Sequence, residues 1–233
     1  MRRALLFALT LLSLPALAED LQPFSASYTA DWKQLPVSGS AERSLKREDD
    51  GRWTLNFEAS MLVAGLTEES TFRVDNQTLM PLTYRLNRSG LGKGKKVEQD
   101  FDWEQKQVIG TDRGDAVRFP LNRGLLDKST YQIALQQDVA AGKKSVSYQV
   151  VDGDEIETYD FRVLGEEVVR TKAGLIDAIE EGPVTVTAGA VERVSTNALF
   201  MLISAAPPKA SATAMEVAIK EFFTFIADFL AGF

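Results

Sequence analysis

From Phe24 to about Glu180 the chain alternates apolar and polar residues with a period of two. This period is typical of strands that bury one face and expose the other. The segment 53–63 is the clearest case, because its odd positions carry Trp53, Leu55, Phe57, Ala59, Met61 and Val63. Shorter runs follow the same pattern and are separated by Gly, Asn, Asp or Pro: FSASYTADW, STFRV, LTYRL, FDWEQKQVIGT and AVRFPL. The pattern predicts a mainly β protein built as an antiparallel, curved meander.

One segment, LLDKSTYQIALQQDVAAGKK, interrupts the strands with a helical pattern. Ser129 with Gln132 three residues later forms a capping-box sequence, and Gly142 stands where a helix would end. Apolar residues recur every four positions, at Tyr131, Leu135 and Val139. We therefore predict a helix near 129–141 that packs on the sheet rather than binding a ligand.

The run YQVVDGDEIETYDFRV, residues 148–163, is the most chemically suggestive part of the chain, with five carboxylates between Asp152 and Asp160. Its two arms are rich in β-forming residues, and the DGD between them suits a two-residue hairpin turn. Calcium would use carboxylates at alternate loop positions, which Asp152, Asp154 and Glu157 partly offer, but the EF-hand pattern is absent. A turn with solvated charges is the favoured interpretation, and these three residues remain the weak candidate metal ligands.

The segment RSGLGKGKK, residues 88–96, superficially resembles a phosphate-binding P-loop. A P-loop needs four residues between its glycines and a Ser or Thr after its Lys, whereas Gly90 and Gly94 enclose three residues and Lys95 precedes Lys96. The motif therefore fails, and the segment predicts a basic hairpin loop.

The N-terminal run MRRALLFALTLLSLPALA has the three parts of a secretory signal peptide. Two arginines precede a short apolar stretch, and Ala16-Leu17-Ala18 provides the small-residue cleavage pattern. We expect cleavage between Ala18 and Glu19, so that residues 1–18 are removed. The apolar stretch is too short to anchor the chain in a bilayer. With no Cys at the cleavage point, the sequence predicts a bacterial periplasmic protein that is not a lipoprotein and whose mature chain does not span the membrane.

Composition narrows the chemistry. Without Arg2 and Arg3 the chain has 24 basic and 33 acidic side chains, a net charge of −9, which argues against nucleic-acid partners and against electrostatic docking on anionic lipid surfaces. The chain has no His and no Cys. This excludes Ser-His-Asp and Cys-His catalytic sites, thiol redox chemistry, disulfides and the common zinc and copper ligand sets. We expect no cofactor. Carboxylate pairs of the glycosidase type and Ser-Lys dyads stay open.

Several of these runs, in a fixed order, resemble a known family: FSASYTADW, GSAERSL, STFRV, PLTYRL, FDWE, the helical segment, YQVVDGDEIETYDFRVLGEE and TKAGLIDAI. The chain is similar, over about residues 24–179, to the exported proteobacterial family catalogued as domain-of-unknown-function family 3108. The most specific part is the helix starting near Asp127 with the strands that follow it. The resemblance implies a periplasmic curved sheet, similar to the half-barrels and β-spirals of other envelope proteins, and it transfers no catalytic residue.

After Ile179 the sequence departs from the pattern of that family, which continues with a Trp-containing strand. Residues 181–233 contain few charges and no Trp or Tyr. A variant C-terminus, an appended segment and a change of reading frame are the three explanations. The tail predicts an amphipathic helix near 213–231, with a polar stripe at Glu216, Lys220, Thr224 and Asp228. Packing on the sheet is favoured for this helix, ahead of binding to a membrane surface or a partner, or a terminal β-barrel strand.

The sequence thus predicts a signal peptide (1–18), an antiparallel β domain (19–180) and a divergent C-terminal segment (181–233). The favoured function is a non-enzymatic periplasmic envelope protein that binds a lipid or a hydrophobic partner segment of an envelope protein in a curved sheet. The alternative is a carboxylate-based hydrolase of cell-wall glycan.

Overall fold

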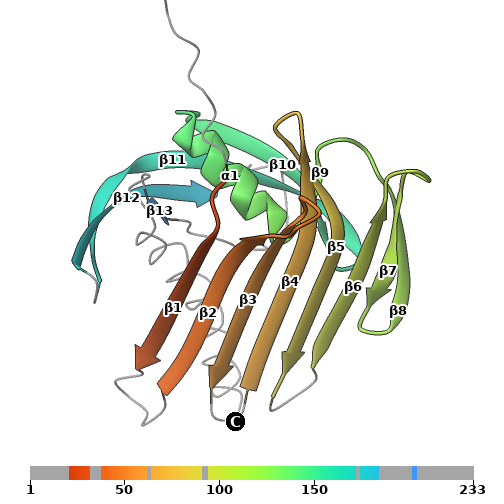
Figure 1. Ribbon diagram of the computed structural model, residues 1–233, viewed down its shortest axis with the longest axis horizontal. Coiled ribbons are helices and arrows are strands. Elements are labelled where there is room, and N and C mark those ends of the chain that lie inside the picture. Colours follow the sequence, from red (N-terminus) through yellow and green to blue (C-terminus); the bar gives the residue numbers. More distant parts are fainter. Residues whose placement is uncertain are drawn as a thin grey trace, which may run out of the picture.

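The computed structural model describes residues 21–31, 38–61, 64–90, 94–171, 174–183 and 201–203. These residues form two β-sheets and one helix (Figure 1). The predicted signal peptide, its cleavage point between Ala18 and Glu19, and the predicted helix near 213–231 lie outside the described residues. The predicted fold class, a mainly β protein, is confirmed, and the described residues contain one helix.

The first sheet contains eight antiparallel strands in sequence order, each paired with its neighbours along the chain. Its strands are β1 (Phe24–Asp31), β2 (Ser38–Arg47), β3 (Trp53–Met61), β4 (Ala64–Asp75), β5 (Thr78–Ser89), β6 (Lys95–Asp102), β7 (Gln107–Asp112) and β8 (Asp115–Pro120). Within the described residues β1 and β8 are the two edges, so this sheet does not close into a barrel. The predicted meander is confirmed for this sheet.

The predicted alternation of buried and exposed positions is present on β3. Its residues Trp53, Leu55, Phe57 and Ala59 are all buried, and we call the face that they occupy the inner face. Register extends this face to the neighbouring strands, since Leu55 pairs with Leu45 on β2 and with Ser70 on β4. The polar residues between them, such as Glu58 and Ser60, are exposed.

The run FDWEQKQVIGT, residues 101–111, predicted as one strand, instead contains the end of β6, a turn at 103–106 and most of β7. The carboxylate of Asp102 accepts hydrogen bonds from the backbone N–H groups of Glu104 (3.0 Å) and Gln105 (2.8 Å). Lys106 then adopts a positive φ of 55°. An aspartate that binds the backbone two and three residues ahead favours a turn over an extended strand. This explains why the run is not one continuous strand.

The second sheet has the order β13-β12-β11-β10-β9 and departs from the meander. Its strands are β9 (Leu125–Asp127), β10 (Ser145–Asp152), β11 (Glu155–Thr171), β12 (Gly174–Pro183) and β13 (Met201–Ile203). All neighbours are antiparallel except β9 and β10, which are parallel and joined through α1 (Thr130–Ala140). Parallel strands need such a crossover. The expected domain boundary at 180 falls within β12.

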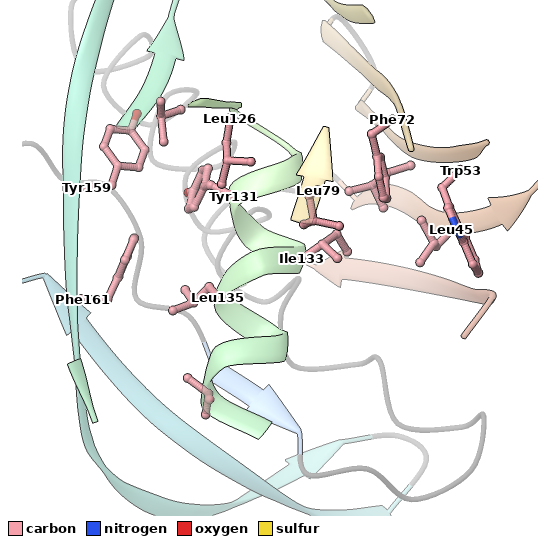
Figure 2. Close-up of a cluster of buried hydrophobic side chains, with 13 residues drawn as sticks. Leu45, Trp53, Phe72, Leu79, Leu126, Tyr131, Ile133, Leu135, Tyr159 and Phe161 are labelled. Atoms are coloured by element: carbon pink, nitrogen blue, oxygen red, sulfur yellow. The ribbon is translucent and has the colours of Figure 1, made fainter. Parts of the chain in front are cut away.

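Helix α1 lies between the two sheets rather than on one of them (Figure 1). The predicted stripe of Tyr131, Leu135 and Val139 is buried, and so is Ile133. Figure 2 shows Ile133 directed toward Leu79 and the first sheet, and Tyr131 and Leu135 directed toward the Tyr159 and Phe161 side. Contact on two sides explains why the helix buries more than one stripe.

The helix ends at Ala140, and Gly142, predicted to stop it, follows with a left-handed φ of 83°. Its N–H donates to the carbonyl of Val139 (2.8 Å), and the N–H of Lys143 donates to that of Asp138 (3.0 Å). These two bonds form the Schellman motif, which requires a left-handed residue at this position.

Two hydrophobic clusters join the sheets. The larger one surrounds α1 and combines residues of both sheets: Leu45, Trp53, Leu55, Phe72, Leu79, Leu126, Tyr131, Ile133, Leu135, Val139, Val150, Tyr159 and Phe161 (Figure 2). The smaller one joins β5, β6 and β7 to β9 and β10 through Tyr84, Val97, Phe101, Val108, Leu121, Leu125 and Val151. Buried polar residues lie beside these clusters where β9 passes into α1: Ser70, Asp127, Ser129 and Thr130.

Candidate functional site

The acidic hairpin predicted from the sequence is present. Asp152 pairs with Glu155 across β10 and β11, which leaves Gly153 and Asp154 as a two-residue turn. Gly153 has a φ of 65°, the conformation that the first position of a primed turn requires. Asp154, one of the three candidate metal ligands, is exposed at the second position.

Asp152 is not a solvated turn charge, which corrects the expectation from the sequence. Its side chain is only 15% exposed, and its Oδ2 accepts hydrogen bonds from Lys128 Nζ (2.6 Å) and from the Tyr159 hydroxyl (2.8 Å). Burial acts to raise the pKa of Asp152, but the Lys128 ammonium and the two hydrogen bonds outweigh it, so the pKa lies below its usual value. The parallel pairing of β9 with β10 brings Lys128 to this carboxylate, and no local pattern shows such a pairing.

Glu157, the third candidate, lies on β11 opposite Val150 and is partly exposed. Burial raises its pKa, and the negative charges of Asp152 and Glu155 add to the effect. The pKa values of Asp152 and Glu157 are therefore shifted in opposite directions. Among the residues that the structure describes, no group of three or more carboxylates is placed to hold a metal ion.

The β9–α1 junction is the most buried polar site of the described chain, and its centre is Asp127. This residue is completely buried. Its Oδ1 accepts hydrogen bonds from the backbone N–H groups of Ser129 (2.7 Å) and Thr130 (2.8 Å), and its Oδ2 accepts one from Ser70 Oγ on β4 (2.7 Å). In return, the N–H of Asp127 donates to Thr130 Oγ1 (3.0 Å). Asp127 thus caps the helix and ties it to the first sheet.

The predicted capping box of Ser129 and Gln132 is wrong. Ser129 makes no side-chain cap bond, because its Oγ donates to Glu68 Oε1 on β4 (2.8 Å). The Gln132 amide donates to the carbonyl of Lys128 (3.0 Å). The sequence held a signal for the true cap, since Asp127 precedes Thr130 by three residues, the spacing at which a capping side chain meets the backbone.

A second carboxylate, Glu68, extends the junction toward β5. Its Oε1 also accepts a hydrogen bond from the Tyr84 hydroxyl (2.9 Å). We call Ser70, Glu68, Tyr84, Asp127, Ser129 and Thr130 the junction network. It joins β4, β5, β9 and α1 through two carboxylates, which accept hydrogen bonds from hydroxyl groups and backbone N–H groups.

Burial dominates the electrostatics of this network. Burial raises the pKa of Asp127 from 3.8 to about 6. The hydrogen bonds from Ser70, Thr130 and Ser129 lower this pKa, but their effect is smaller than that of burial. Burial and the charge of Glu68 raise the pKa of Tyr84 well above 10.0. Burial and the charge of Asp152 likewise raise that of Tyr159. Both phenols therefore stay protonated, and they act as hydrogen-bond donors rather than as bases.

The hairpin turn also contacts the first sheet. The amide Nε2 of the fully buried Gln99 donates to the carbonyl of Gly153 (3.2 Å). A Cβ added to Gly153 would lie 2.6 Å from Asp112 Oδ2. The turn therefore fits against β6 and β7 only with glycine at this position, and its role is to join the two sheets.

The profile of the family described as "Protein of unknown function (DUF3108)" matches residues 27–201. The chain belongs to this family. The match covers most of the DUF3108 chain described above, from β1 to the first residue of β13, and so extends past Ile179. No curated protein matches the chain.

A solved structure is also similar to the DUF3108 chain. It is titled "Crystal Structure of Beta-barrel-like Protein of Domain of Unknown Function DUF1849 from Brucella abortus". The identity is 13% over 68% of this chain and 77% of the other, with a TM-score of 0.44. Within the described residues, no helix of the DUF3108 chain has the length and apolar character needed to cross a membrane.

Asp127→Asn should change how stability of this DUF3108 protein depends on pH. Because the folded pKa is raised, the folded state binds the proton more tightly than the unfolded state. The wild-type chain should therefore gain up to about 3 kcal/mol of unfolding free energy as the pH falls from 7 to 4, and this gain is lost again as the pH rises through about 6. The variant, which keeps the cap but cannot ionise, should lack this component in urea unfolding at several pH values. Equal pH dependence of the two proteins would contradict the assignment.

Gly153→Ala should destabilise the protein more than Gly51→Ala. Both glycines have positive φ, but a Cβ at Gly51 meets nothing within 4 Å, so the control carries only backbone strain, about 1–2 kcal/mol. The crowding against Asp112 should add about 1–3 kcal/mol, as in other overpacked sites, and Asp112→Ala in the Gly153→Ala background should recover part of it. Chemical denaturation measures all four proteins. An equal loss in both single variants would show that the turn does not press on Asp112.

Proposed function

We propose that this chain is an exported, non-enzymatic protein of the bacterial cell envelope that binds a lipid or a hydrophobic partner segment. The ligand would lie on the inner face of the first sheet, at the part remote from α1. The observation that carries the proposal is an apolar area on this face that belongs to neither of the two hydrophobic clusters.

This apolar area consists of Ala41, Phe57 and Ala59, and it continues to Leu66. Register places Ala41 opposite Ala59 on β2 and β3, and Ala59 opposite Leu66 on β4. Phe57 lies two residues from Ala59 on the same face. The first three are buried, yet neither cluster that joins the sheets includes them. In the proposed complex, an apolar chain would pack along the sheet against these small side chains and the aromatic ring.

Export and the absence of catalysis are supported by the sequence and by the junction network. The N-terminal run has the layout of a secretory signal peptide. The hydroxyl groups of Ser70 and Ser129 at the junction donate their protons to the carboxylates of Asp127 and Glu68, which also hold the helix in place. A network that satisfies its own carboxylates in this way stabilises the fold and does not present a reactive group.

Phe57→Ala should reduce the lipid or other apolar ligand that copurifies with protein isolated from the periplasm. Removing the ring takes away the largest apolar side chain of the proposed site. Organic extraction followed by mass spectrometry measures the ligand per mole of protein, and we expect a loss of severalfold.

Phe72→Ala is the matched control, because it removes a buried ring of the same sheet that belongs to the cluster around α1. Both variants should lower the melting temperature, but only Phe57→Ala should release ligand at temperatures where both are folded. Wild-type protein that is repeatedly empty, or equal ligand loss in both variants, would reject the proposed site.

One observation favours the alternative function, a carboxylate-based hydrolase of cell-wall glycan. The pKa of Asp152 is lowered while that of Glu157 is raised, and such a split is typical of a base and an acid in glycosidases. If this function is correct, Glu157→Gln abolishes the turnover of a peptidoglycan substrate without lowering the melting temperature, whereas Asp154→Asn at the exposed turn leaves it intact. Wild-type protein without activity on glycan would reject it.

A further inference from the structure

We propose that the β9–α1 junction is a pH-sensitive latch, which holds α1 against the first sheet while Asp127 is protonated and lets the two part when Asp127 is ionised. The latch goes beyond the proposed function and does not depend on the nature of the ligand. Its geometry is that of one buried carboxylate held from two sides, by the start of the helix and by β4.

The two oxygens of Asp127 have partners of different kinds. Oδ1 accepts hydrogen bonds from the backbone N–H groups of Ser129 and Thr130, which can only donate. Oδ2 accepts one from the Ser70 hydroxyl on β4, at 2.7 Å, and a hydroxyl group can also act as an acceptor. A proton on Oδ2 can therefore be donated to Ser70 Oγ with the heavy atoms where they are. The closed junction thus accepts the protonated carboxyl group without losing its connection to β4.

The ionised carboxylate, in contrast, has no cation beside it. The titratable groups of the elements that meet at the junction are Glu68 on β4, Tyr84 on β5, Lys128 before α1, Tyr131 on α1, Asp152 on β10 and Tyr159 on β11. The charge of Glu68 opposes the ionisation of Asp127. Lys128 is bound to Asp152, at 2.6 Å, and among the described residues no other ammonium or guanidinium group pairs with a junction carboxylate. Ionised Asp127 is therefore a buried negative charge close to a second one, an arrangement that opening to water relieves.

The pKa of Asp127 supports the same direction. Burial raises it from 3.8 to about 6 in the closed junction, and hydration in the open form returns it toward the ordinary value. The closed form therefore binds the proton more tightly, so closure is favoured at low pH and this advantage is lost as the pH rises through about 6. With these two values, the ratio of open to closed molecules should rise about tenfold between pH 5 and pH 7.

The opening lies between α1 and the first sheet, because the helix is held more extensively on its other side. Toward the second sheet, Tyr131 packs on the ring of Tyr159, with centroids 5.0 Å apart, and the Tyr148 hydroxyl donates to Asp138 Oδ2 (2.8 Å). The helix also connects β9 to β10 of that sheet. Toward the first sheet it directs Ile133 (Figure 2) and the hydrogen bonds of the junction network. The helix therefore stays with the second sheet when the latch opens.

Amide hydrogen exchange of the mature chain tests the latch, measured by NMR at pH 5 and pH 7 and over a series of low urea concentrations. The amides of Ser129 and Thr130 report the junction, and those of β3 report global unfolding. After correction for intrinsic exchange rates, we expect the junction amides to be about tenfold better protected at pH 5 than at pH 7. At both pH values they should be less protected and less dependent on urea than the β3 amides, as local opening requires.

Three variants separate the proton from the packing. Asp127→Asn keeps a capping side chain but cannot ionise, so the protection of its junction amides should not change between pH 5 and pH 7. Ser70→Ala removes a hydrogen bond that lowers the pKa of Asp127, so the midpoint of the pH dependence should move above 6. Ser129→Ala is the matched control, because it removes only the bond to Glu68 and keeps the backbone N–H that binds Asp127. Its midpoint should stay near 6.

Each contrary result overturns a stated part of the latch. Equal protection of the wild-type junction amides at the two pH values, or an unchanged pH dependence in Asp127→Asn, rejects Asp127 as its switch. Junction amides that match the β3 amides in both protection and urea dependence reject local opening, because the junction would then open only when the whole protein unfolds. A midpoint that moves as far in Ser129→Ala as in Ser70→Ala rejects the assignment of the proton to the Ser70 side.

Discussion

The carboxylate of Asp127 is the interaction on which the arrangement of the two sheets depends. It is completely buried at the point where β9 becomes α1, and it binds the first turn of the helix and Ser70 on β4 at the same time. A buried charge is costly unless hydrogen bonds satisfy it, and here three donors do so only when the helix and the first sheet are in place together. The site therefore favours one orientation of the helix over the many that an apolar contact alone would permit.

The hydrophobic clusters on either side of this network supply most of the stabilising burial, and the polar groups determine how the parts are aligned. Tyr131, Tyr159 and Phe161 pack on the side of α1 toward the second sheet, with ring centroids 5.0 Å apart for the first two and 5.9 Å for Tyr131 and Phe161. On the β10 side, Lys128 and Tyr159 bind Asp152. Three carboxylates thus lie at the segment 127–130: Asp127 on β9, Glu68 on β4 and Asp152 on β10. Each accepts a hydrogen bond from a residue distant in sequence.

The fold was largely predictable from the sequence, and the site was not, for a physical reason. Alternation at Trp53, Leu55 and Phe57 reports which face of a strand is buried, and Gly142 reports the end of a helix through its backbone preference; both are local properties. The bonds of Ser70 to Asp127 and of Ser129 to Glu68 join residues 57 and 61 positions apart. Which residues form such distant pairs depends on the register of the strands, and a local sequence pattern does not show that register. The acidic hairpin was correctly located, but the inward direction of Asp152 depends on β9, a three-residue strand that is too short for periodicity to reveal.

The nearest-neighbour order of the first sheet bears on how the chain reaches its folded state. Each of its eight strands pairs with the strand before or after it, so hairpins can add one after another from the N-terminal end at a small loop-closure entropy. The second sheet and the junction need contacts between distant segments, and contacts of this kind slow folding. We therefore expect a folding order in which the meander precedes the closure of the β9–α1 junction. Until that closure, the inner face of the meander would be an open apolar surface, and this is the stage of folding at which the chain is most prone to aggregation.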